Sequence, residues 1–147
     1  MILRPATMAD EERLLRWRND PDTRESSRHQ GEVSPEEHHD WLARALASPN
    51  EVRLYVAEDA GLPIGTGRLA LWPEGPEASV TVAPEHRGRG LGRRLIHLLV
   101  AEAGRLGYPM LVAEVRGRNA ASLSAFLQSG FQPSSPEAMI RLERAVT

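Results

Sequence analysis

The segment Arg87-Gly88-Arg89-Gly90-Leu91-Gly92 decides how this chain is interpreted. It follows an apolar stretch at 78–82 and precedes a run with helical apolar spacing, from Leu91 to Leu106. Glycines let a backbone turn tightly and approach a ligand without an intervening Cβ. The first N–H groups of the following helix lack internal partners and lie at the positive end of its dipole. The segment therefore predicts a loop that binds phosphate.

Two familiar phosphate-binding patterns do not fit this loop. The P-loop needs Gly-Lys-Ser/Thr, but all 18 basic residues counted as Lys or Arg are arginines. The dinucleotide fingerprint needs a third glycine three positions after the second, where this chain has Arg93 or Leu95. What remains is an arginine, two spacers, a glycine, one spacer and a glycine. An ordinary glycine-rich loop with a solvated basic face is the alternative.

The segments on either side of this loop predict an alternation of strands and helices. Ser34-Pro35-Glu36-Glu37 is typical of a capped helix start. We expect strands at 1–5, 52–58, 64–72, 78–82, 110–115, 131 and 139–142, helices at 10–18, 35–47, 91–106 and 119–129, and an irregular polar segment at 23–33. This order predicts one mixed α/β domain over residues 1–147.

Composition excludes several classes of function. The chain has 147 residues, is 41% hydrophobic and carries a formal charge of −2, so it can bury a core but offers no basic footprint for nucleic acid. Cysteine is absent, which excludes disulfides, thiolate zinc sites and cysteine nucleophiles. The first residues include Arg4 and show no apolar signal region, and no apolar run is long enough to span a bilayer. We expect a cytoplasmic protein that binds neither membrane nor nucleic acid.

Further motifs surround the loop in a recognisable order. A strand ending Val80-Thr81-Val82 precedes it, and Glu114-Val115-Arg116, then Asn119 and Gly130-Phe131, follow it. Together they resemble the GCN5-related N-acetyltransferases (the GNAT superfamily). The resemblance implies an α/β (α+β) fold: a mixed, mostly antiparallel sheet of about six or seven strands, with strands 4 and 5 splayed apart, flanked by about four helices.

The N-terminal third resembles a narrower branch of that superfamily. Leu15–Pro21 and Ser34–Trp41 look like the sub-group of ribosomal-protein N-terminal acetyltransferases and nucleotide-activated amino-sugar N-acetyltransferases. The match does not separate the two.

The resemblance implies acetyl-coenzyme A as cofactor. Val80 and Val82 would offer backbone groups to the pantetheine arm, and the loop N–H groups would hold the pyrophosphate, with side-chain help from Arg87, Arg89 and Arg93. Asn119 would contact the pantetheine side or simply cap its helix, and Phe126 would pack near the thioester. The implied cofactor-binding residues are Val80, Val82, Arg87, Gly88, Arg89, Gly90, Leu91, Gly92, Arg93, Asn119 and Phe126.

The chemistry implied is direct attack of a neutral amine on the thioester. Glu114 is the implied general base; the alternative is a structural glutamate paired with Arg68 or Arg116. Many family members have a tyrosine seven residues after the asparagine, which protonates the departing thiolate. This chain has Phe126 there, so water or another side chain must supply that proton, or the chain binds the cofactor and catalyses poorly.

The sequence says least about which residues bind the acceptor. Arg24, His29 and Trp72 are candidate acceptor contacts; the alternative is a solvated polar loop for Arg24 and His29, and local packing for Trp72. Trp17 and Trp41 are expected in the core, and His38-His39 predicts no metal site because adjacent helical side chains diverge.

Three functions remain open. The first is acetyl transfer to a small-molecule amine such as an amino sugar, and the second is acetylation of a peptide N-terminus. The third is a non-catalytic acyl-CoA-binding module. The resemblance also allows two copies to pair through their sheets as a homodimer.

Overall fold

The computed structural model describes residues 1–26, 31–73, 75–116, 120–135 and 139–146. Its elements in chain order are β1 (Ile2–Pro5), a 3-10 turn (Met8–Asp10), α1 (Glu11–Arg18), α2 (Pro21–Ser26), α3 (Pro35–Leu46), β2 (Val52–Asp59), β3 (Leu62–Trp72), β4 (Gly75–Val82), a second 3-10 turn (Pro84–His86), α4 (Leu91–Arg105), β5 (Met110–Arg116), α5 (Ala120–Gln128), β6 (Gln132–Ser135) and β7 (Met139–Ala145). Among the described helices, none has the length and apolar character needed to cross a bilayer.

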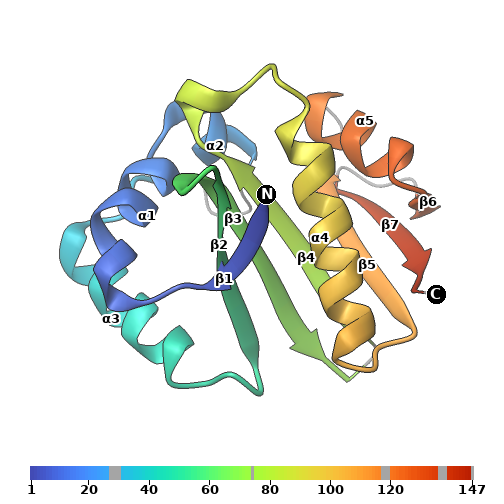
Figure 1. Cartoon of the computed structure of the whole chain (residues 1–147), viewed down its shortest axis with the longest axis horizontal. Coiled ribbons are helices and arrows are strands. Elements are labelled where there is room, and N and C mark those ends of the chain that lie inside the picture. Colours follow the sequence, from blue (N-terminus) through green and yellow to red (C-terminus); the bar gives the residue numbers. More distant parts are fainter. Residues whose placement is uncertain (27–30, 74, 117–119, 136–138, 147) are drawn as a thin grey trace.

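The strands form one sheet in the order β1-β2-β3-β4-β5-β7-β6 (Figure 1). The β4–β5 pair is parallel, and the other neighbouring pairs are antiparallel. This confirms the expected mixed, mostly antiparallel sheet, with seven strands. The parallel pair requires a crossover connection, which α4 provides.

Helices cover both faces of the sheet. The apolar side chains of β2 accordingly alternate between two hydrophobic cores, one on each face. Tyr55 and Ala57 belong to the larger core with α4 and α5, whereas Leu54 and Val56 pack with α1 and α3 on the opposite face. In Figure 1, α4 crosses one face of the sheet and α1 and α3 lie together at its β1–β2 end.

The central helix α4 lies close to β3 because of a glycine. A Cβ at Gly67 would come within 3.0 Å of the side chains of both Leu95 and Leu99. The apolar spacing of α4 buries Leu91, Leu95 and Leu99 along one stripe. Gly67 thus fixes the depth of α4, and with it the position of the glycine-rich loop at its start.

The expectation of an irregular segment from residue 23 is wrong at its beginning, where α2 forms. The Asp20 carboxylate accepts a hydrogen bond from the backbone N–H of Thr23 at 3.2 Å, as an N-cap residue does. The described residues therefore form five α-helices, where about four were expected. The start of α3 matches its prediction, since the Ser34 hydroxyl accepts from the N–H of Glu37.

Candidate functional site

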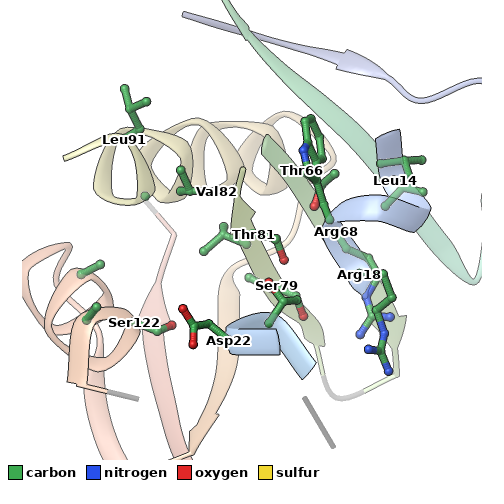
Figure 2. Close-up of a pocket in the computed structure, with 18 of the residues that line it drawn as sticks. Leu14, Arg18, Asp22, Thr66, Arg68, Ser79, Thr81, Val82, Leu91 and Ser122 are labelled. Atoms are coloured by element: carbon green, nitrogen blue, oxygen red, sulfur yellow. The ribbon is translucent and has the colours of Figure 1, made fainter. Parts of the chain in front are cut away.

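A cavity of about 1450 Å³ lies where β4 separates from β5. We call its two ends the loop half, lined by His86–Gly88, Gly90–Arg93 and α5, and the sheet half, lined by α1, α3, β3 and β4. Figure 2 shows side chains from both halves around one space.

The separation of two strands creates this cavity. In the part of the chain that the structure describes, β4 and β5 pair at one position, Glu77 with Val112. On its other edge β4 pairs continuously with β3, from Gly75 to Val82. The backbone of β4 beyond Glu77 therefore borders the cavity, and Val80 and Val82 are among its lining residues.

The glycine-rich loop adopts the backbone that its sequence predicts. Gly88 and Gly90 have φ angles of 78° and 72°, in the left-handed region, and a Cβ at either would meet open space. Gly90 is the N-cap of α4 and offers no side chain to the first N–H groups of that helix. These groups and the helix dipole can hold an anion in the loop half of the cavity.

The arginines of the loop have different surroundings. The Arg87 guanidinium donates to Thr23 Oγ1 at 3.0 Å and lies 2.9 Å from Asp20 Oδ2. Arg89 Nη1 lies 2.9 Å from His86 Nδ1, and Arg89 is absent from the described lining of the cavity. Arg93 is exposed on the first turns of α4 and lines the loop half.

The α5 side of the cavity is apolar at its base. Phe126 lines the loop half, is buried, and packs edge-on against Phe131 with ring centroids 5.0 Å apart. Asn119 lies outside the described residues. The backbone of Glu114 is on β5 opposite Arg141 of β7, and its side chain lies outside the described part of the chain.

The sheet half is built on the face of the sheet that α4 does not cover. Side chains on neighbouring strands share a face when their residues pair directly. Three such pairs line this half: Thr66 with Thr81, Arg68 with Ser79, and Ala70 with Glu77. Figure 2 shows Arg68 of β3 and Arg18 of α1 extending toward the same corner.

Two tryptophans that were both expected in the core have different surroundings. Trp17 is 2% exposed and belongs to the core with α1 and α3, as predicted. The core prediction for Trp41 is wrong: this side chain is 37% exposed and lines the cavity. It lies on α3 one turn after the buried His38, whose ring centroid is 5.7 Å away. Helical spacing alone does not show whether a side chain packs into the core or lines an open cavity.

The candidate acceptor residues are placed differently. Trp72 lines the sheet half, and its indole N–H donates to Glu77 Oε2 at 3.2 Å. Arg24 is on α2 and is absent from the described lining, and His29 lies outside the described residues.

Sequence reasoning missed Glu77. This half-buried carboxylate lies in the sheet half, at the position where β4 and β5 meet. The polar alternation of Glu77, Ser79 and Thr81, which begins one residue before the strand predicted at 78–82, could have identified it. Among the described residues, no group of three His, Cys, Asp or Glu side chains could hold a metal ion.

Comparison with known proteins identifies a matching family and several similar acetyltransferases. The family described as "Acetyltransferase (GNAT) domain" matches residues 1–132. The chain is 37% identical over 108 residues to the L-methionine sulfoximine/L-methionine sulfone acetyltransferase of Salmonella typhimurium, covering 62% of this chain and 63% of that protein. It is 35% identical over 98 residues to an L-amino acid N-acyltransferase of Escherichia coli, covering 62% and 55%. The matches thus span less than two thirds of both relatives.

Solved structures share the whole fold. A ribosomal-protein-alanine N-acetyltransferase from Brucella melitensis superimposes with a TM-score of 0.81 at 25% identity, covering 99% of each chain. A spermidine N-acetyltransferase from Vibrio cholerae, in complex with CoA and spermine, gives 0.86 at 19% identity, covering 98% of this chain and 94% of the other.

Proposed function

This chain belongs to the GNAT acetyltransferase family, and on that basis we propose that it transfers an acetyl group from acetyl-CoA directly to the primary amine of a small molecule. The observation that carries the proposal is the continuity of the cavity. One space reaches from the glycine-rich loop, past the bare edge of β4, to polar side chains on the other face of the sheet.

The residues in the loop half and along the unpaired edge of β4 fit acetyl-CoA. The left-handed Gly88 and Gly90 leave room beside the α4 N–H groups for a diphosphate, and Arg93 adds a positive charge. The β4 edge at Val80 and Val82 suits the amides of a pantetheine arm, which would pair with it as a strand does. Phe126 offers an apolar surface for the thioester end.

The acceptor amine must lose a proton for transfer to occur. An amine with a pKa near 10.4 is about 3.4 units above pH 7, which costs roughly 4.6 kcal/mol. A base takes that proton as the new C–N bond forms and the C–S bond breaks, releasing coenzyme A thiolate. Glu114 is the base that the family resemblance implies, and Glu77 is a second candidate because it lines the sheet half.

The leaving thiolate must take its proton from a group other than Phe126. Phe126 has none to give, and its ring is packed against Phe131. A free thiol has a pKa of about 8.5 by analogy with cysteine, so solvent can protonate the product near neutral pH.

A peptide N-terminus is the second candidate acceptor. It is favoured by the ribosomal-protein-alanine N-acetyltransferase that matches over nearly the whole chain. An amino sugar remains a candidate within the small-molecule class. A cytoplasmic location and pairing into a homodimer stay predictions.

Release of free thiol from acetyl-CoA tests the proposal. The chain has no cysteine, so a thiol reagent reports coenzyme A alone. The panel should contain amino acids, glucosamine and its phosphate, and short peptides with free N-termini, with acetyl-CoA affinity measured by calorimetry. We expect acetyl-CoA to bind and a small-molecule amine to be acetylated. Binding without turnover of any amine would identify a binding module, and absence of binding would overturn the proposal.

A further inference from the structure

The charged side chains of the sheet half differ in burial. Among those the structure describes, Glu37, Asp40 and Arg44 are exposed, so they form a solvated rim. Arg18, Arg68 and Glu77 are half-buried, so they lie deeper in the wall. Water screens the rim charges more strongly than the deeper ones. The charges of these two guanidiniums and this carboxylate are therefore the least screened at this end of the cavity.

The strand register places Arg68 and Glu77 diagonally on one face of two neighbouring strands. Arg68 pairs with Ser79, and Glu77 is two residues from Ser79 on the same strand and face. A diagonal relation of this kind separates the backbones by roughly 7–8 Å, within reach of long side chains. Arg18 approaches the same space from α1 and extends toward the corner that Arg68 occupies (Figure 2). A small ligand can thus contact the cations on one side and Glu77 on the other.

The environment of Arg18 favours an anion. Burial, and to a lesser degree the charge of Arg24, lower the pKa of the Arg18 guanidinium. Each effect disfavours the cation, so a carboxylate placed beside this guanidinium would stabilise its charged form. Arginine is suited to this role because its planar fork matches both oxygens of a carboxylate.

We propose that Arg18 and Arg68 bind the carboxylate of an α-amino acid acceptor whose amine faces Glu77. The inference rests on the proposed function and narrows its substrate class. A peptide N-terminus carries a neutral amide where an amino acid has its carboxylate, and a neutral amino sugar carries hydroxyls there. Polyamines would bring further positive charge toward the two arginines.

Matched acceptors test the proposal. L-Methionine, L-leucine and L-phenylalanine should each be compared with the α-carboxamide and with the decarboxylated amine. The carboxamide has the less basic amine, so chemistry alone favours it. We expect kcat/KM to be at least 30-fold higher for the amino acids. Equal or faster use of the carboxamides, or turnover of glucosamine phosphate or peptides alone, would overturn the inference while leaving the proposed function intact.

Variants connect that preference to the two arginines. Arg68→Gln and Arg18→Gln should each raise KM for an amino acid at least tenfold and change kcat/KM for its carboxamide less than threefold. Arg16→Gln on the exposed face of α1 is the matched control and should change neither value. Unchanged acetyl-CoA affinity shows that each variant is folded. If a Gln variant does not fold, the Arg→Lys variant at the same position is tested in its place. Equal losses for both acceptors would overturn the assignment.

Discussion

The guanidinium of Arg87 lies 2.9 Å from the carboxylate of Asp20, which joins the glycine-rich loop to the start of α2. Asp20 also caps α2 through the N–H of Thr23, and Arg87 donates to the Thr23 hydroxyl. Asp22 and Thr23 line the cavity. Arg87 therefore connects the loop half to a helix that lines the same cavity, in addition to the phosphate contact that the family resemblance implies.

Asp20→Asn isolates this connection, because asparagine caps a helix about as well as aspartate. The variant keeps the cap and removes the charge that faces Arg87. We expect KM for the acceptor to rise severalfold, since α2 is held less firmly. Arg87→Gln should do the same, and the double variant should be no worse than the more affected single variant. Fully additive effects in this cycle would show that the two residues act independently.

Gly90→Glu should abolish acetyl-CoA binding measured by calorimetry. The new carboxylate would stand beside the N–H groups that hold the diphosphate, and a left-handed φ of 72° disfavours a side chain there. Gly107→Glu at the far end of α4 is the matched control, because Gly107 has a φ of 88° and equally open surroundings. It carries the same backbone strain and should bind acetyl-CoA with unchanged affinity. Unchanged affinity in Gly90→Glu would contradict the loop assignment.

Glu114→Gln should lower kcat more at pH 7 than at pH 9. At high pH a larger fraction of the acceptor amine is already neutral, so loss of the base matters less. Glu77→Gln should be measured in parallel over the same pH range. The variant that shows the pH-dependent loss identifies the base, and a pH-independent loss in Glu114→Gln would remove that residue from the role.

Asp10→Asn should reduce stability at neutral pH. Arg4 donates to both carboxylate oxygens of the buried Asp10, at 2.8 and 2.9 Å, and lowers the pKa of that carboxyl from 3.8 to about 2. Asp10 therefore binds a proton more weakly in the folded than in the unfolded chain. Its stabilisation, about 2 kcal/mol, is present above the unfolded pKa and is lost as the pH falls toward 2.

Urea unfolding at pH 7 and at pH 2.5 measures this difference. The gap between wild type and Asp10→Asn should narrow at the lower pH. Glu12→Gln on the exposed face of α1 is the control and should match wild type within about 0.5 kcal/mol at both. A gap that stays constant with pH would show that shape, not charge, makes Asp10 stabilising.

The parts of the fold predicted from sequence are those with local signals. The loop and α4 followed from glycine placement and apolar spacing, and the start of α3 from its capping residue. The helix α2 was missed because Asp20-Pro21-Asp22 is as typical of a turn as of a helix start, although Asp20 caps α2 and Pro21 is its first residue. The separation of β4 from β5 came from a family resemblance, since no apolar pattern marks where two strands stop pairing.

The site was predicted less completely than the fold. Glycine-loop residues carry a recognisable spacing, whereas the wall of the sheet half depends on pairing between strands. Arg68 becomes a neighbour of Ser79 and Glu77 only through the β3–β4 register. Trp41 was misassigned because burial depends on what faces a helix, and α3 faces a cavity at that point.

The part of β4 that does not pair with β5 also affects how fast the protein is degraded. A ligand that completes this interrupted edge binds the folded chain and not the unfolded one, so its concentration sets part of the folding equilibrium. At a free level 100 times its Kd, mass action adds about 2.7 kcal/mol. Proteolysis of the transiently opened chain should then slow when metabolism is rich in acetyl donor and quicken when that donor is scarce.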